Sequence, residues 1–295
     1  MGMWRLAARE WPLIGFTLLS QAAVGAFWMI AAGELFIARK SVWAAERVAT
    51  VPVFLTVAGM LAGAALLSFF HLGRPLRAPL VLNNVRRSWL SREILIELVF
   101  GGLVVLNTLL VPHSPGSGTV QGALIALTAV AGVFFLFSMA KIYMLETVPA
   151  WRGVYTPLSF FLSAVLLGPL TLVVAHRRLL DLGRSLEAFL NVAIISALAA
   201  VLLSVMTMLF FTPSVGFFGT RSHTLLAFPT RKTYPVLFVR MAFLAAAVVC
   251  LMLAGRDVSF GRETVRWPAL ALVCVGAAEI IGRAFFYAIY SRIGV

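Results

Sequence analysis

The stretch HLGRPLRAPLVLNNVRRSWLSREILIE, residues 71–97, organises the chain, because it is a polar connection between two of the most apolar segments. It contains one His, five Arg, two Glu, two Asn and two Pro. A connection that only faces water needs none of this chemistry. A connection that closes a pocket at a membrane surface, for a redox-active ligand that carries protons, could use most of it.

The composition is that of an integral membrane protein, with 61% hydrophobic and 12% charged residues. About 20 apolar residues are needed to cross a bilayer as a helix. We therefore predict an all-α bundle of eight transmembrane helices, with both termini on the same side, forming a single domain over residues 1–295. The apolar segments cover residues 12–37, 46–70, 93–112, 119–144, 155–176, 187–212, 235–255 and 267–290.

The net charge of +13 lies almost wholly in the connections. In a soluble protein it would suggest nucleic acid, but here we expect none. We expect these cations to anchor helix ends at the bilayer surface and to contact lipid or a partner protein. Thirteen of the 24 Lys and Arg lie on the side of the termini and nine on the other, a difference too small to set the orientation.

The sequence encodes no metal site that we can recognise. Cys250 and Cys274 lie in separate apolar segments without a CxxC pattern, which argues against an iron–sulfur cluster or a structural zinc. The four His, at 71, 113, 176 and 223, lie at helix boundaries or in connections, so haem has no axial ligands within the helices. Electrons would have to move from an organic carrier to another subunit.

His71 closes the second predicted helix and Glu93 opens the third, so both lie at the same membrane face. Quinol oxidation needs one group that hydrogen-bonds a quinol oxygen and another that accepts a proton. We predict that His71 and Glu93 supply these roles. An alternative remains for each residue. His71 could simply be solvated at the bilayer surface, and Glu93 could only interact favourably with the helix dipole in the first turn of its helix.

Three arginines and a second carboxylate surround this pair. Arg74, Arg77 and Arg92 are candidates to bind the quinol head group or to dock a partner subunit. Glu97 lies one helical turn beyond Glu93, on the same helix face. It could relay protons or form an ion pair with one of the arginines, and we slightly favour the ion pair.

Other polar residues lie within the apolar segments. Lys141 and Tyr143 end the fourth helix at the face of His71, where they could line the quinol pocket or only anchor the helix. Gln21 is either a hydrogen-bond donor to the ligand or a tie between helices. The spacing of Glu279 and Arg283 predicts an ion pair within the last helix.

Small residues recur at helix-packing spacing in the first two helices and predict close packing of their backbones. They are Gly15, Ala22, Gly25 and Ala26 in the first helix, and Ala58, Gly59, Ala62 and Gly63 in the second.

Three stretches together resemble the membrane anchor subunit of DMSO reductases. They are EWPLIGFTLLSQAAVGAF (10–27), HLGRPLRA with SWLSRE (71–78 and 88–93), and AEIIGRAFFY (278–287). The resemblance spans nearly the whole chain and includes the number of helices. By motif, the quinol-site His and Glu of that family fall on His71 and Glu93.

The resemblance implies a subunit that is no enzyme alone but binds menaquinol as its redox substrate. It implies two partners, a four-cluster iron–sulfur subunit and a molybdopterin catalytic subunit, in a bacterial or archaeal cytoplasmic membrane. It also implies that the iron–sulfur subunit docks beside residues 71–97. Catalytic subunits of the family usually carry twin-arginine export signals, which would place that face and the termini in the periplasm.

Two other functions stay open on the residues alone. One is a secondary transporter or ion channel that uses Glu34, Glu97 and Glu279, although we find neither internal repeats nor clearly broken helices. The other is a purely structural anchor without a quinol site. The terminal electron acceptor, a property of the missing catalytic subunit, is not encoded here.

Overall fold

A computed structural model describes residues 10–33, 51–71, 75–110, 118–148, 151, 153–176, 184–206, 230–259 and 266–288. All regular structure within these ranges is helical, as the sequence predicts. The helices are α2 (Trp11–Ala32), α3 (Val51–His71), η4 (Pro75–Asn84, a 3-10 helix), α4 (Trp89–Leu110), α5 (Gly118–Tyr143), α6 (Tyr155–Ala175), α8 (Arg184–Met206), α10 (Thr230–Ser259) and α11 (Arg266–Ala288).

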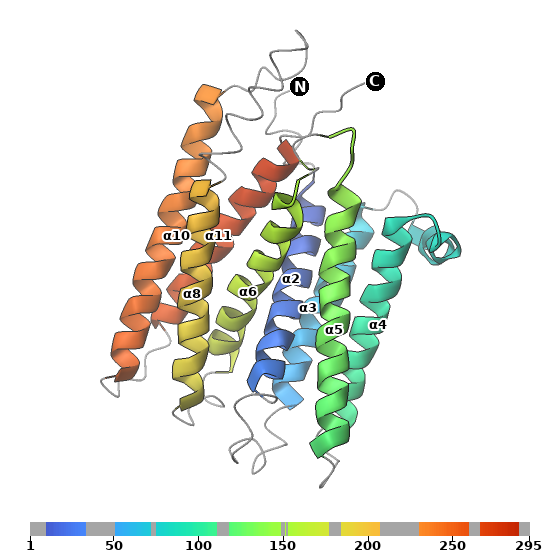
Figure 1. The fold of residues 1–295 in the computed structure, drawn as a ribbon, viewed down its shortest axis with the longest axis horizontal. Coiled ribbons are helices and arrows are strands. Elements are labelled where there is room, and N and C mark those ends of the chain that lie inside the picture. The colour runs from blue at the N-terminus through green and yellow to red at the C-terminus, as the bar shows by residue number, and fades with distance from the viewer. Residues whose placement is uncertain are drawn as a thin grey trace.

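The long helices lie side by side in one bundle and alternate in direction along the sequence (Figure 1). The start of α2 and the end of α11 lie at the same end of the bundle, which also carries η4 (Figure 1). We call this the η4 end. Because directions alternate, the last turns of α3 and α5 and the first turns of α4, α6 and α10 lie there too.

Seven of the described helices are long and apolar enough to cross a membrane. The other two are the short 3-10 helix η4 and helix α8, in which Ile194–Met206 forms a shorter apolar segment. The predicted helices correspond in order to the observed ones, and the largest difference that bears on the site is that α4 starts at Trp89 instead of residue 93. The fold is that of a multi-pass membrane protein.

Helix α2 forms the centre of the bundle. Within its candidate membrane span 72% of the residues are buried, against 22% for α4 and for α10, whose outer sides are left for lipid. Its closest neighbour is α6. A Cβ atom built on Gly25 would overlap the carbonyl group of Ala164, and one built on Gly168 would overlap the backbone nitrogen of Ala26. The two backbones are therefore in direct contact.

The prediction of close packing by small residues is correct for α2 and only partly correct for α3. A Cβ atom on Gly15 would lie 2.5 Å from Cδ1 of Leu67, so this glycine also makes room for a neighbour. On α3, Gly63 faces Leu19 at 3.6 Å, whereas Gly59 has nothing within 4 Å. Because Gly59 lies on an exposed side of α3, its small size serves no observed helix contact.

Candidate functional site

The connection from η4 to α4 is held by local hydrogen bonds. The Asn84 carbonyl accepts from the backbone N–H groups of Arg87 and Ser88, each at 3.0 Å. The Ser88 hydroxyl oxygen accepts from the N–H of Ser91 at 3.3 Å, as a helix N-cap does. This cap begins α4 one turn before the expected start, so Glu93 lies inside the helix.

Arg92 stabilises the same connection through its side chain. Its Nε donates to the Val85 carbonyl at 2.9 Å, its Nη2 donates to the Arg86 carbonyl at 2.7 Å, and its guanidinium lies 4.4 Å from the centre of the Trp89 ring. These contacts show Arg92 positioning the start of α4.

Glu93 is enclosed within the protein, with only 3% of its surface exposed. It belongs to the buried side of α4, together with Phe100, Val104 and Asn107. Its carboxyl group is close enough to Tyr143 on α5 and to Glu97 to interact with both electrostatically. Glu97 is partly exposed. The structure therefore places a buried carboxyl group near the η4 end, between α4 and α5.

Tyr143, the last residue of α5, is buried, which excludes the interpretation that it only anchors a helix at the bilayer surface. Its hydroxyl lies 2.9 Å from that of Tyr287 on α11. Its ring packs against Trp151, Phe160 and Phe286, with centroid distances of 5.5 to 5.6 Å. Two phenol hydroxyls thus face each other inside an aromatic cluster.

Gln21 ties α2 to two other helices. Its Oε1 accepts from Nη2 of Arg283 at 3.0 Å, and its Nε2 lies 3.8 Å from the sulfur of Met139. Gln21 has no exposed surface, and Arg283 is only 3% exposed. The guanidinium carbon of Arg283 lies 3.8 Å from the centre of the Phe160 ring. Of the two predicted roles of Gln21, the structure shows the tie between helices.

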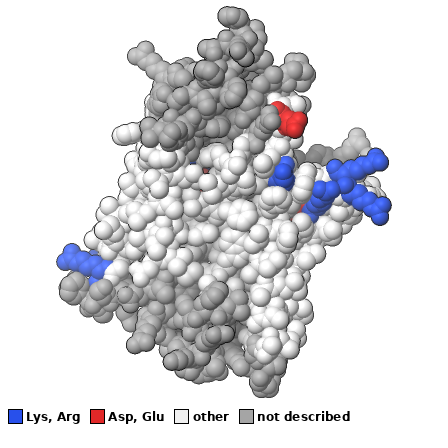
Figure 2. Space-filling model, viewed as in Figure 1, with Lys and Arg blue, Asp and Glu red and all other residues white. Residues whose placement is uncertain are grey.

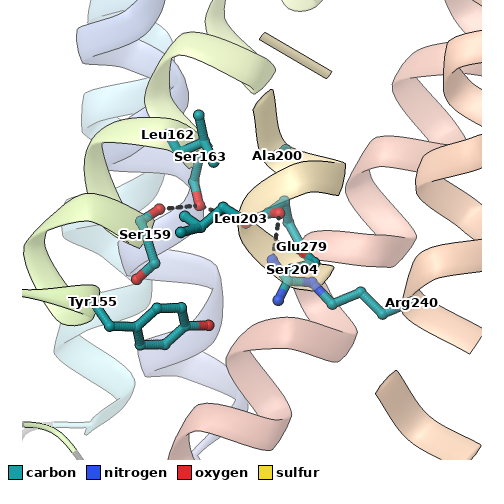
Figure 3. A pocket seen from close by; sticks show the side chains of 9 residues that line it. All are labelled: Tyr155, Ser159, Leu162, Ser163, Ala200, Leu203, Ser204, Arg240 and Glu279. Carbon is teal, nitrogen blue, oxygen red and sulfur yellow. Dashed lines mark hydrogen bonds and ion pairs between the residues drawn. The ribbon is translucent and has the colours of Figure 1, made fainter. Parts of the chain in front are cut away.

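The predicted ion pair between Glu279 and Arg283 is wrong. Glu279 accepts from Nη2 of Arg240 on α10 at 3.2 Å, and its other oxygen accepts from the Ser163 hydroxyl at 2.5 Å. Figure 3 shows Arg240 and Ser163 approaching Glu279 from different helices. Spacing along one helix allows a pair, but here partners on neighbouring helices approach more closely. The carboxylate consequently ties together α6, α10 and α11.

A small cavity adjoins this ion pair, lined by α6, α8, α10 and α11 (Figure 3). Tyr155 and Ser159 contribute from α6, and Ser204 contributes from α8. Among the described residues, the Ser204 hydroxyl and Nε of Arg240 have no hydrogen-bond partner. Glu93 does not line this cavity.

On the face shown in Figure 2, the charged side chains of the described residues lie towards the two ends of the bundle. Figure 2 shows Lys and Arg gathered beside η4 and at the far end of α10, with an uncharged band between them on the visible face. Arg86 and Arg87 are exposed beside η4, and Lys141 is partly exposed, with its Nζ 5.8 Å from the centre of the Trp89 ring. Such a band is what a bilayer requires.

Several predicted residues cannot be placed in the site. His71 is the last residue of α3, so its backbone lies at the η4 end. The side chains of His71 and Arg77, and the whole of Arg74, lie outside the described residues. Glu34 as a whole also lies outside the described residues. Among the described candidates, the structure brings Glu93, Tyr143 and Gln21 into the interior and leaves Arg92 and Lys141 partly exposed.

Residues 5–289 match the family described as DMSO reductase anchor subunit (DmsC). The protein belongs to this family. It is similar to the C subunit of anaerobic dimethyl sulfoxide reductase from Escherichia coli K12, with 30% identity over 97% of this sequence and 96% of the relative. The YnfH subunit from the same strain is also 30% identical, and the C subunit from Haemophilus influenzae is 26% identical, each over the same shares of the two sequences. No solved structure matches.

Sequence reasoning missed the partners that complete these buried clusters. Tyr287 stands out in the sequence only as a residue following Arg283, and Arg240 only as a cation within an apolar segment. An arginine in such a segment is a signal that a partner must exist, although it does not say which. Ser163 carries no signal, because serines are common where helices pack.

Proposed function

We propose that this protein is the menaquinol-oxidising membrane anchor of a three-subunit molybdopterin reductase of the DMSO reductase type. The family membership supports the anchor role. The relatives are named as components of anaerobic dimethyl sulfoxide reductases, which supports assembly with further subunits. The expected partners are an iron–sulfur subunit and a molybdopterin catalytic subunit.

The observation that carries the quinol site is the position of Glu93. Its carboxyl group is buried near the η4 end, and α3 ends at His71 at the same end of the bundle. Burial of a carboxyl group in a membrane protein costs free energy that packing alone does not recover. Such a group therefore favours a functional role. The boundary of the bilayer is also where a lipid-soluble quinol would place its polar head group.

The proposed reaction converts menaquinol to menaquinone and releases two electrons and two protons. His71 hydrogen-bonds one hydroxyl oxygen of the quinol, and Glu93 accepts the proton of the other hydroxyl as electrons leave. Both protons are passed on to water at the membrane surface. The electrons leave one at a time to the iron–sulfur subunit. The membrane anchor itself therefore needs no metal for this reaction.

Electron transfer requires the iron–sulfur subunit to dock close to the quinol. Arg86 and Arg87, exposed beside η4, offer a positively charged surface for it. We assign the η4 end to the periplasmic side of the cytoplasmic membrane, because the catalytic subunits of such complexes are usually exported.

Binding of a fluorescent menaquinol analogue to membranes that carry the complex tests this function. We expect His71→Ala to abolish analogue binding while reductase activity with an artificial donor remains, which shows that the complex is assembled. His176→Ala is the matched control, because His176 follows α6 at the opposite end of the bundle. Unchanged binding in His71→Ala would move the site elsewhere. A complex without menaquinol-dependent activity in the wild type would be a purely structural anchor.

A further inference from the structure

Trp89 lies on the outer surface of the bundle at the η4 end, where helices α4 and α5 meet. It is the first residue of α4, and 37% of its surface is exposed. Its ring packs edge-on against Phe137 of α5, with a centroid distance of 6.1 Å. Tryptophan is enriched where a bilayer meets water, because its ring system has an apolar body and a polar N–H group. Trp89 therefore marks the boundary of the membrane on this side of the bundle.

Two cations flank the Trp89 ring. The guanidinium carbon of Arg92 lies 4.4 Å from the centre of this ring, and Nζ of Lys141 on α5 lies 5.8 Å from it. The same Nζ lies 5.7 Å from the centre of the Phe137 ring. The aromatic rings therefore hold one cation from each helix at a surface that α4 and α5 share.

The contacts of these cations leave their positive charge uncompensated. Arg92 donates to two backbone carbonyl groups, which are neutral, and an aromatic ring attracts a cation without neutralising it. Among the described residues, neither Arg92 nor Lys141 forms an ion pair. The exposed carboxyl group of Glu146, shortly after the end of α5, pairs with neither of them. The two cations can therefore bind an anion.

An exposed apolar stripe on α5 continues from Lys141 towards the middle of the bundle. Its residues are spaced three or four apart, which places them on one face of the helix. They are Leu127, Val130, Phe134 and Phe137, each 40 to 57% exposed. From residue 127 to residue 141 a helix rises by roughly 21 Å, which exceeds the roughly 15 Å hydrocarbon depth of one bilayer leaflet. The stripe is therefore long enough to contact an acyl chain along its length.

The surroundings of the two cations favour a lipid over a protein partner. Both α4 and α5 are long and apolar enough to cross a membrane, and the cations border their exposed apolar faces. Figure 2 shows cations beside η4 directly adjoining an uncharged surface. A water-soluble subunit does not reach into the bilayer, whereas a phospholipid has a phosphate for the cations and acyl chains for the stripe.

We propose that the seam between the first turn of α4 and the last turns of α5 binds one anionic phospholipid. Its phosphate lies between Arg92 and Lys141, and an acyl chain follows Phe137 and Phe134 towards the middle of the bilayer. A zwitterionic phospholipid is a poorer ligand, because its own ammonium group offsets the charge of the phosphate. The site does not depend on the proposed oxidation of menaquinol.

Native mass spectrometry of the purified complex, titrated with phosphatidylglycerol or with phosphatidylcholine, tests this site. We expect phosphatidylglycerol to bind more tightly than phosphatidylcholine. Lys141→Gln should weaken phosphatidylglycerol binding about fivefold, the usual contribution of one basic side chain at an anionic membrane surface. Lys141→Arg keeps the positive charge and should bind phosphatidylglycerol nearly as well as the wild type. Phosphatidylcholine binding should be the same in all three proteins.

Arg266→Gln is the matched control. Arg266 also lies over a tryptophan ring, 4.7 Å from the centre of Trp267, but it begins α11 at the opposite end of the bundle. Its replacement removes one charge and should leave phosphatidylglycerol binding unchanged. Equal binding of the two lipids by the wild type would overturn the proposal and leave the cations to a protein partner. Wild-type phosphatidylglycerol binding in Lys141→Gln would overturn it too. So would an equal loss in Arg266→Gln, because binding would then follow net charge and not this site.

Discussion

Glu279 on α11 forms its ion pair with Arg240 on α10, across 3.2 Å, and not with Arg283 one helical turn further along its own helix. Both members are at most 13% exposed. Gly282 makes the approach possible, because a Cβ atom there would lie 2.9 Å from the Arg240 guanidinium. The pair therefore joins the last two helices within the membrane domain.

Removal of one member of this pair should be more harmful than removal of both. We expect Arg240→Leu to destabilise the protein by about 3–5 kcal/mol, because it leaves a buried carboxylate without its cation. The double variant Arg240→Leu/Glu279→Leu should recover much of that loss. The thermal unfolding midpoint of the purified protein in detergent measures both. An equal loss in single and double variants would contradict the role of the pair.

The contact between α2 and α6 should not tolerate a methyl group. Gly25→Ala would make its Cβ atom overlap a backbone oxygen of α6, so the helices must separate. We expect a loss of about 1–3 kcal/mol or more, the usual effect of overpacking. Gly59→Ala is the control, because nothing lies within 4 Å of a Cβ atom there. The amount of folded protein in membranes reports the difference, and equal amounts for the two variants would refute the contact.

The tie between Gln21 and Arg283 should depend on the acceptor oxygen of Gln21. We expect Gln21→Leu to cost about 1–3 kcal/mol, since it leaves a buried guanidinium without this acceptor. Gln21→Glu keeps an oxygen in the same place and should retain more stability than Gln21→Leu. Thermal unfolding of the two variants, compared with the wild type, checks the order. If leucine were the better tolerated residue, the hydrogen bond would contribute nothing.

His176 should make stability depend on pH. The Thr56 hydroxyl donates to the Pro52 carbonyl, so it accepts from Nε2–H of His176 at 2.6 Å. Both the neutral and the protonated imidazole can keep this bond. Burial of the imidazole lowers the pKa of His176 from its ordinary 6.5. The unfolded protein therefore takes up this proton at a higher pH than the folded protein does.

Stability should consequently fall as the pH drops through about 6.5 and level off below the lowered pKa of the folded state. His176→Gln keeps a donor for Thr56 and removes the titration. The difference in unfolding midpoint between about pH 8 and about pH 5.5, which bracket the ordinary histidine pKa, should be smaller in this variant than in the wild type. An identical pH response in the two proteins would show that His176 makes no contribution.

The helices are well predicted from the sequence because each is one apolar segment bounded by polar residues. The start of α4 is not, because Trp89 and Leu90 precede the carboxyl group that marks the expected helix opening. The structure shows Ser88 as the cap, with Trp89 as the first residue of the helix. The sequence contains suitable capping residues, but Ser88 and Ser91 could both serve as the N-cap of α4.

The buried contacts could be predicted only in part. Gln21 is expected to need a polar partner, but sequence spacing cannot show that Arg283, near the opposite terminus, supplies it. The same holds for Tyr143 and Tyr287, which meet only because α5 and α11 end together. Partners within one helix follow from its periodicity. Partners between helices follow from how the helices pack.

Menaquinol-dependent turnover of the assembled complex with Glu93→Gln tests the central proposal most directly. Glutamine fills the same buried space but cannot accept the proton of the quinol. We expect the rate to fall by about 10²-fold or more, while activity with an artificial donor stays at the wild-type level. A menaquinol-dependent rate close to that of the wild type would contradict the assignment of Glu93 as the proton acceptor.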